Sequence, residues 1–454
     1  MKIKYFILII IYIKIEFTSR ISIIIKSSYN FIKNEMKLKE NYNLKKPIKL
    51  AIYTYSLKGG GTERLTALFI NYISKIEFFN LYLFSQKEKE KNEFKISKNI
   101  KRLIIKDGYI GNLIRTLYKK RIDILIYQFP KGDEINILNQ LKKIKIIFYE
   151  NSCFFYWIYY NYYSFKPLYD AYKKSKYVIS LVPFENDYLY KKWGINSILM
   201  NNFITYEYNY IIPSDLSSQI IIMIGRCNDK MKRFNLGIKA MKYITKVIPK
   251  SEMKIITNLN YIDYLNKTIF DLKLQNNIKF FQYTSIPEIY YKNSSLHIFP
   301  SVSESFSLVL SEANMYGIPS ILVGLDYIST INRGTIIIYD DNSTSIAREA
   351  IKILKNEKYR KKLGKEARKS MKKFKNDILI KKWINLIISI YFNDDYFETI
   401  KNEEKKINKQ DYDNIMKNQI RFLRNRIPNL KNITFENLEN FTYMSNLEKL
   451  NNLY

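Results

Sequence analysis

Histidine and cysteine are scarce in this sequence. Its 454 residues include one histidine, His297, and two cysteines, Cys153 and Cys227. One histidine excludes a His-based metal cluster and a His-dependent triad, and we expect His297, which lies on an apolar strand, to be a hydrogen-bonded core residue. Two cysteines without metal-ligand spacing exclude a disulfide framework and favour a reducing, cytosolic setting.

Glycine and proline are also infrequent, at 13 and 10 residues. Hydrophobic residues make up 47% of the chain and aromatic residues 15%, which supplies enough apolar material for packed cores. This composition excludes a linker-rich or disordered protein. Because 454 residues are too many for one core, we expect two domains with appendages.

The N-terminus lacks an apolar run that could cross a membrane. The run from Tyr5 to Ile13 is shorter than the roughly 20 residues that a span needs. Lys14 and Glu16 interrupt the apolar pattern, and no small-residue cleavage site follows it, which disfavours a signal peptide. We therefore expect residues 1–46 to be a leader, either a weak membrane anchor or a dispensable segment.

Acidic residues are in deficit, with 42 Asp+Glu against 75 Lys+Arg and a net charge of +33. One interpretation is a partner that carries phosphates, such as a nucleic acid, an anionic membrane or a small molecule. The charge is spread along the whole chain, however, so we attribute most of it to composition. Without a concentrated basic patch or a recognition motif we expect no nucleic acid partner, while peripheral contact with an anionic membrane stays an alternative.

Strand-like and helical segments alternate along the chain. "PIKLAIYTYS" from Pro47 is an apolar strand, and "LKGGGTERLTALFINYISKI" is a glycine turn that opens an amphipathic helix. Further apolar strand candidates lie at 79–85, 101–105, 122–128, 145–150, 176–182 and 197–201. Continuously apolar strands separated by helices predict a parallel sheet.

A second alternating series follows a polar break at 205–219, where we place a domain boundary. It begins with the strand "IIIMIG" and ends with the helix "DILIKKWINLIISIY" near Tyr391. The expected fold class is α/β, with two Rossmann-like domains facing a cleft. The predicted parts of the chain are the leader, a first domain at 47–205, a second at 206–391 and a charged helical or disordered tail at 392–454.

The segment "HIFPSVSESFSLVLSEANMYGIPSILV" from His297 to Val323 contains two glutamates, Glu304 and Glu312, among apolar residues. A carboxylate is costly to bury unless it is paired or bound. The pattern predicts a strand, a loop and then a helix over 306–316, with Gly317 at its C-terminal end. Glu304 would precede that helix, and Glu312 would lie about two turns inside it.

The loop before this helix is expected at the carboxyl end of a parallel strand, where ligands bind in open α/β sheets. The free amides at the start of the helix would form an anion site. Eight residues of helix span roughly 12 Å, the scale of a sugar diphosphate with its ribose. Each glutamate could therefore accept hydrogen bonds from hydroxyl groups at one end of such a ligand.

The two glutamates resemble a known family signature. Glu304, seven further residues, Glu312 and then "GIPSIL" are similar to the E-x7-E signature of retaining glycosyltransferases of family 4, the glycosyl transferases group 1, which have the GT-B fold. The segment "IIIMIGRCNDKMKRFNLGIKAM" is similar to a second segment of that family, with Gly225, Arg226 and Lys232 at matching places. The resemblance covers about residues 48–391.

This resemblance implies transfer of a hexose-type sugar from a nucleotide sugar to an acceptor hydroxyl, with retention of configuration and without a metal or other cofactor. Arg226 and Lys232 would hold the leaving diphosphate, Glu304 the sugar hydroxyls and Glu312 the ribose. The remaining donor-binding residues would be Gly60, Gly61, Gly225, Ser305, Phe306, Ser307 and Leu308. The implied partners are a nucleotide sugar and a glycan or lipid-linked acceptor, in the cytoplasm or at a membrane surface.

Three departures from the family pattern motivate an alternative, a degenerate GT-B protein that binds nucleotide sugar or glycan without turnover. Ser305 stands where a glycine usually follows the first glutamate, and Gln282 replaces another common glycine. Glu150 and Asn151 occupy the stretch where many members have a histidine. An epimerase on the same fold would need further acids or bases in the cleft, which the sequence does not offer.

Overall fold

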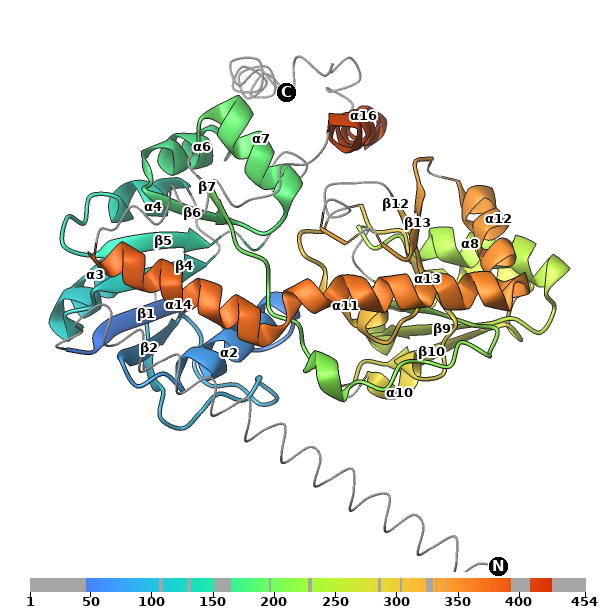
Figure 1. The fold of residues 1–454 in the computed structure, drawn as a ribbon, viewed down its shortest axis with the longest axis horizontal. Helices are drawn as coiled ribbons and strands as arrows, with labels where there is room; N and C mark the ends of the chain where they lie inside the picture. Colours follow the sequence, from blue (N-terminus) through green and yellow to red (C-terminus); the bar gives the residue numbers. More distant parts are fainter. Residues whose placement is uncertain are drawn as a thin grey trace, which may run out of the picture.

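The computed structural model contains two α/β domains side by side (Figure 1). Each has a parallel sheet at its centre with helices packed against it, so the predicted fold class is confirmed. The structure describes residues 46–105, 109–128, 132–149, 151, 165–195, 197–227, 231–284, 287–302, 304–323, 330–331, 333–340, 342–392 and 409–426. Glu150, Cys153 and the leader up to residue 45 lie outside these residues.

The first domain is built on a seven-stranded sheet in the order β3-β2-β1-β4-β5-β6-β7, with every pair parallel. Its strands are β1 (Ile48–Thr54), β2 (Phe79–Ser85), β3 (Lys101–Ile104), β4 (Ile124–Gln128), β5 (Lys145–Tyr149), β6 (Tyr177–Ser180) and β7 (Ser197–Leu199). Its helices are α2 (Gly61–Ile73), α3 (Tyr109–Lys120), α4 (Gly132–Leu138), α6 (Phe165–Lys174) and α7 (Pro183–Trp193). The strands predicted from the sequence agree with these within two residues at each end.

The second domain has a six-stranded sheet in the order β10-β9-β8-β11-β12-β13, again parallel throughout. Its strands are β8 (Ile220–Ile224), β9 (Glu252–Thr257), β10 (Ile278–Gln282), β11 (Leu296–Phe299), β12 (Ser320–Val323) and β13 (Thr335–Ile338). Its helices are α8 (Phe234–Val247), α9 (Asp263–Asp271), α10 (Glu288–Tyr291), α11 (Leu308–Met315), α12 (Ser343–Lys355) and α13 (Glu357–Ser370). Short 3-10 turns are η2 (Tyr208–Tyr210), η3 (Leu259–Tyr261) and η5 (Met371–Phe374). The predicted boundary at 205–219 lies between β7 and β8.

Strand composition separates the centre of each sheet from its edges. Every residue of the central strands β4 and β11 is buried, because each strand is apolar along its length and covered on both faces. The edge strands β3 and β10 are partly exposed and contain charged residues such as Lys101, Arg102 and Lys279. Charged side chains on an edge strand oppose pairing with another chain.

Both sheets reverse their strand order once, between β1 and β4 in the first domain and between β8 and β11 in the second. Ligands of open α/β sheets bind outside the carboxyl ends of the strands at such a switch point. The glycine turn at 58–61 follows β1, the loop with Arg226 follows β8, and the loop with Glu304 follows β11. The topology therefore brings the loops singled out in the sequence to the two switch points.

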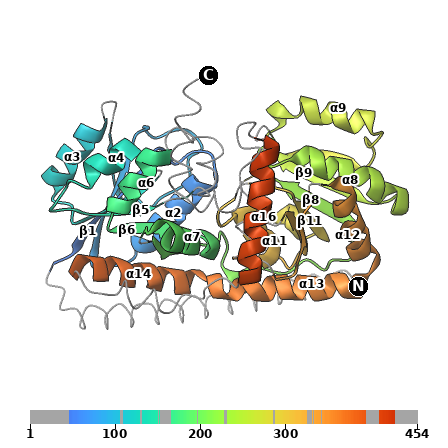
Figure 2. The same ribbon diagram turned by 90° about the horizontal axis from the view of Figure 1, so that it is seen from above.

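The helix α14 (Asn376–Phe392) returns from the second domain and lies along one side of the first (Figures 1 and 2). Its Trp383 is fully buried, with ring centroids 4.7 Å from Phe69 and 5.3 Å from Tyr149. Lys145 donates from Nζ to the last carbonyls of this helix, at 2.6 Å from the oxygens of Ile390 and Tyr391. The first domain is thus completed by a helix from the end of the second.

The described part of the predicted tail is a helix, α16 (Lys409–Arg426). Ile415 and Met416 are fully buried, and the Tyr412 ring lies 5.1 Å from that of Phe184 in α7. Figures 1 and 2 place α16 at the boundary between the two domains. Within the described residues no helix has the length and apolar character needed to cross a membrane.

Candidate functional site

The first of the two sequence-predicted glutamates, Glu304, is held by two side chains of its own domain. Lys232 donates from Nζ to Glu304 Oε1 in an ion pair. Ser301 donates from Oγ to the same oxygen at 3.0 Å. The two charged side chains are 19% and 11% exposed, so the pair lies at the edge of the protein interior. Two of the three predicted catalytic residues are therefore in direct contact.

Arg226, the third, directly follows Gly225 at the end of β8. The Gly225 amide donates to the Ile256 carbonyl at 3.1 Å, which fixes the loop to the neighbouring strand. A Cβ at Gly225 would meet the Lys232 side chain at 3.6 Å, so the glycine lies directly beside that lysine. The Arg226 side chain is exposed, unlike that of Lys232.

Tyr283, just after β10, lies among the charges of the site. The Tyr283 side chain is 46% exposed, but the surrounding protein partly desolvates its hydroxyl and raises its pKa to about 12, with Glu312 and Glu304 adding to the rise and Arg64 and Arg226 opposing it. Its backbone amide donates to the Thr257 carbonyl at 2.9 Å. Because all four charged groups influence one phenol, the structure brings Arg226, Glu304 and Glu312 into the same region.

The helix α11 begins at Leu308, two residues later than the sequence predicted. Ser307 is its N-cap: it has a positive φ of 43°, and its Oγ accepts from the Leu310 amide at 3.4 Å. A non-glycine residue with positive φ is strained and is often found near a binding site. Among the described residues, the amides of Leu308 and Val309 have no acceptor. These amides can bind an anion at the start of the helix.

Glu312 lies in this helix four residues after its start, so the prediction of about two turns was wrong and one turn is correct. Its side chain is 4% exposed. Oε1 accepts from Arg64 at 3.1 Å, and Oε2 accepts from the Tyr291 hydroxyl at 2.9 Å. Burial, together with the hydrogen bond to Glu312, raises the pKa of Tyr291 well above its usual value.

Arg64, which comes from α2 of the first domain, was missed by the sequence reasoning. Burial lowers its pKa, but the field of Glu312 and the neighbouring tyrosines outweighs that effect and raises it. Its guanidinium carbon lies 5.7 Å from the centre of the Tyr206 ring. The only signal in the sequence is its place in the first turn of the helix that follows the glycines, and this does not reveal its partner.

The glycine turn lies where the two domains meet. Gly59 has φ of +115°, a conformation that favours glycine, while the Gly60 amide donates to Glu63 Oε2 at 2.9 Å. A Cβ at Gly61 would contact Leu308 Cδ1 at 3.6 Å, so the start of α2 abuts the start of α11. Gly60 and Gly61 are thus close to the predicted anion site, although the Gly60 amide already has an acceptor.

Two further predicted donor-binding residues have structural contacts. Ser305 donates from Oγ to the Asn151 carbonyl at 2.9 Å, a further hydrogen bond between the domains. The Asn151 side chain is buried, and its Oδ1 has no partner among the described residues. Phe306 is buried against Phe374, with ring centroids 5.1 Å apart. Phe306 therefore anchors the loop by packing.

His297 is buried on β11, as the sequence predicted, but it is not fully hydrogen-bonded. Nδ1 lies 3.1 Å from Ser320 Oγ on the neighbouring strand, whereas Nε2 has no partner in the described part of the chain. Burial lowers the pKa of His297 to about 3. The imidazole is therefore neutral at physiological pH and takes no part in the charged cluster.

No cluster of three or more His, Cys, Asp or Glu side chains suited to a metal ion occurs among the described residues.

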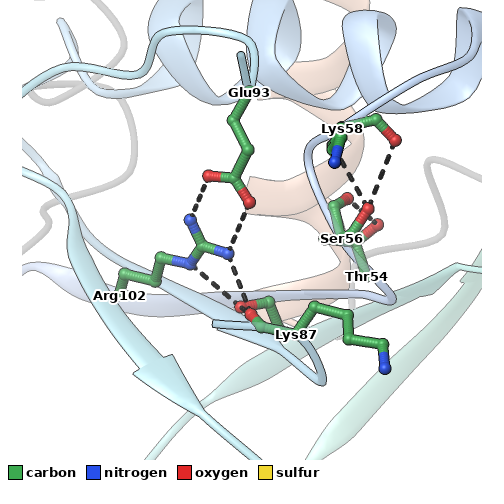
Figure 3. Close-up of polar contacts among 7 residues, drawn as sticks. Thr54, Ser56, Lys58, Lys87, Glu93 and Arg102 are labelled. Atoms are coloured by element: carbon green, nitrogen blue, oxygen red, sulfur yellow. Dashed lines mark hydrogen bonds and ion pairs between the residues drawn. The ribbon is translucent and has the colours of Figure 1, made fainter. Parts of the chain in front are cut away.

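The first domain contains an ion pair away from the domain boundary, between Arg102 and Glu93 (Figure 3). Arg102 donates to both Glu93 oxygens, at 2.6 and 3.0 Å, and to the Lys87 carbonyl at 3.0 Å. In the same view Ser56 Oγ accepts from the Lys58 amide at 3.2 Å, which stabilises the turn leading to the glycines.

Comparison with known proteins matches residues 210–370 to the family Glycosyl transferases group 1. The poly(glycerol-phosphate) alpha-glucosyltransferase of Bacillus subtilis (strain 168) is 27% identical over 207 residues, which are 44% of this chain. The match spans only 29% of the length of that relative.

Two solved structures resemble the whole two-domain body. Sucrose-phosphate synthase from Thermosynechococcus elongatus has a TM-score of 0.63 at 13% identity, covering 75% of this chain and 99% of that one. Anabaena Alr3699/HepE, in complex with UDP and glucose, has a TM-score of 0.62 at 12% identity, with the same coverage. At such low identity these structures show the fold alone, and they confirm two facing Rossmann-like domains.

Proposed function

We propose, from the match of residues 210–370 to the glycosyl transferases group 1 family, that the chain transfers a hexose-type sugar from a nucleotide sugar to an acceptor hydroxyl. The observation that carries this proposal is the cluster at the switch point of the second sheet. It combines Arg226, the ion pair of Lys232 with Glu304, and the amides at the start of α11. These are groups suited to a diphosphate and to sugar hydroxyls.

The chemistry follows from where charge grows during the reaction. As the bond between sugar and diphosphate breaks, negative charge develops on the leaving phosphate. We assign Arg226 and Lys232 to the stabilisation of that charge, the arginine through its planar fork and the lysine as a point charge. Two cations and helix amides can supply this stabilisation, so we propose metal-independent transfer. Retention of configuration is proposed from the similarity of Glu304 and Glu312 to the E-x7-E signature.

Glu304 and Glu312 are given separate roles. Ser301 and Lys232 orient Glu304, which we assign to the sugar hydroxyls. Glu312 lies deeper in α11, and we assign it to the ribose. Since a carboxylate offers about four acceptor positions, each glutamate can accept from a ligand hydroxyl while keeping its protein contacts.

For the donor and acceptor we propose first candidates drawn from the relatives. UDP-glucose is the first donor to test, because UDP and glucose are bound in the Anabaena structure of the same fold. The name of the Bacillus relative makes poly(glycerol phosphate) the first acceptor to test, beside neutral and lipid-linked glycans. A chain of net charge +33 would attract a polyanionic acceptor by long-range electrostatics.

The test is calorimetric binding of UDP together with release of UDP from UDP-glucose in the presence of each acceptor. Arg226→Ala should weaken UDP binding and also slow turnover, each roughly ten- to a hundredfold, since a charged hydrogen bond contributes about 1.5–3 kcal/mol. Arg348→Ala is the matched control, because Arg348 is a surface arginine that is 71% exposed. Unchanged UDP affinity in Arg226→Ala would remove Arg226 from the donor site.

A second candidate function is binding of nucleotide sugar or glycan without turnover. The hydrogen bond from Ser305 to the Asn151 carbonyl favours it, because a side chain spans the domain boundary at a position where the family usually has glycine. UDP binding by the wild type without release of UDP from any sugar nucleotide, with any acceptor, would select this candidate.

A further inference from the structure

Arg64 joins the two domains through the second glutamate. It lies on α2 of the first domain, yet its Nη1 donates to Glu312 Oε1 on α11 of the second domain at 3.1 Å. The two residues are 248 positions apart in the sequence. The Glu312 side chain is 4% exposed and that of Arg64 23%, so the pair is largely shielded from water. A shielded pair with this geometry fixes the position of the carboxylate.

Two tyrosines surround the pair, one contacting it through its hydroxyl and the other through its ring. Tyr291 binds the second oxygen of Glu312, and the Tyr206 ring lies against the Arg64 guanidinium. Burial raises the pKa of the Tyr206 hydroxyl to about 12, with Glu312 adding to the rise and the adjacent Arg64 opposing it. Glu312 uses one acceptor position on each oxygen, which leaves positions for two further donors. An oriented carboxylate with open acceptor positions suits the vicinal hydroxyl groups of a ribose.

We propose that Arg64 is a cross-domain positioning residue, which orients Glu312 so that the carboxylate can accept hydrogen bonds from the ribose of the donor. This inference rests on the proposed function and adds to it a side chain of the first domain that acts on recognition of the donor's ribose. Arg64 does not touch the reacting bond. It acts through Glu312, and its contribution exists only when the two domains are together.

A purely structural role for Arg64 makes a different prediction. If the pair only held the domains together, its loss would weaken every ligand of the cleft to the same extent. If Arg64 orients Glu312 for the ribose, its loss weakens only ligands that have ribose hydroxyls. The ratio of affinities for a nucleotide with and without these hydroxyls therefore separates the two roles.

The experiment measures calorimetric dissociation constants of UDP and 2′,3′-dideoxy-UDP for the full chain and its variants. ADP and GDP, with their dideoxy forms, are run in parallel, and the tightest pair is used. The wild type should bind the ribose form at least tenfold more tightly than the dideoxy form. In Arg64→Ala the affinity for the ribose form should fall at least tenfold, while that for the dideoxy form stays within threefold. Arg64→Lys, which keeps the charge, should restore part of the preference.

Arg102→Ala is the matched control, because it breaks an Arg–Glu pair that lies within the first domain. It should leave both dissociation constants unchanged. Equal weakening of both nucleotides in Arg64→Ala, or no ribose preference in the wild type, would overturn the inference and leave the proposed function intact. Failure of the wild type to bind any of the nucleoside diphosphates would overturn the proposed function as well. Thermal unfolding of each variant confirms folding, and Arg64→Lys provides the test if Arg64→Ala does not fold.

Discussion

Glu304 and Glu312 belong to one signature, but the structure gives them partners of different origin. Glu304 pairs with Lys232 and Ser301, both from its own domain. Glu312 pairs with Arg64 from the other domain and with Tyr291. The first glutamate is therefore set by local loops, whereas the second depends on how the domains face each other. Of two carboxylates on one short segment, one therefore depends on contacts within its domain and the other on contacts between the domains.

The difference also concerns how easily each cation could return to water. Lys232 has a long flexible stem, and it can move its charge outward if Glu304 is lost. Arg64 is confined between Tyr206 and the α11 helix, and its planar guanidinium needs a specific geometry. Loss of its partner would leave an unpaired charge in a shielded position. The comparison can be tested by neutralising each glutamate in turn.

The largest effect is expected for Glu312→Gln. It should lower the free energy of unfolding by about 3 kcal/mol, because it removes the charge that compensates a buried guanidinium. Glu304→Gln should cost about 1 kcal/mol, because Lys232 can reach water and the amide oxygen still accepts from Ser301. Urea denaturation of both variants measures the difference. Equal losses would show that the cross-domain position of Glu312 has no energetic consequence.

His297, unlike the two glutamates, is a buried titratable group without a charged partner. Its pKa in the folded protein is about 3, against 6.5 as the ordinary value. Between these values the unfolded chain binds a proton that the folded chain does not, so stability is present above pH 6.5 and is lost as the pH falls toward 3. From pH 7 to pH 5 the loss should be about 2 kcal/mol, since each pH unit below 6.5 costs about 1.4 kcal/mol.

The measurement is the urea midpoint of the wild type and of His297→Gln at both pH values. The variant should lose less stability on acidification, by the amount that His297 contributes. The carboxylates titrate in both proteins, so they cancel in this difference. If both proteins have the same pH dependence, the folded imidazole takes up protons as easily as the unfolded one.

A small effect, similar to that of Glu304→Gln, is expected for Ser305→Ala. It removes a further hydrogen bond between the domains, from Oγ to the Asn151 carbonyl, and should cost about 1 kcal/mol of stability. A hydroxyl is uncharged, so this loss should be independent of salt, unlike the loss in Glu312→Gln. Urea denaturation at low and high salt checks this. A marked salt dependence in Ser305→Ala would mean that nearby charges had rearranged.

The sheets could be predicted from the sequence because their signal is local. A run such as "IIIMI" in β8 is apolar at every position, which is typical of a strand buried on both faces. The start of α11 was predicted two residues early, because Phe306 continues the apolar pattern of the helix and conceals that Ser307 serves as the cap. The cap depends on a positive φ at Ser307, and a serine in the sequence does not predict that conformation.

In the candidate site, too, contacts set by local loops could be predicted and contacts between the domains could not. The proximity of Lys232 and Glu304 could be predicted from their loops, since parallel strands bring their carboxyl ends to one edge of a sheet. The pairing of Arg64 with Glu312 could not, because it depends on the rotation of one domain against the other. Tyr206 and Tyr291 were also missed, as 40 tyrosines in the chain give no single one a signal.

The helix α14 makes the second domain an insertion within the first. Trp383 fills the first domain's core against Phe69 and Tyr149, and Asn376 is hydrogen-bonded at 3.0 Å to both the amide and the carbonyl of Ile204. During synthesis the ribosome therefore releases the seven strands of the first domain long before the helix that completes their core. The second domain, contiguous in the chain, can fold as soon as it emerges, whereas the first must wait for residue 392. The first domain, although synthesised before the second, is therefore the last to complete its core.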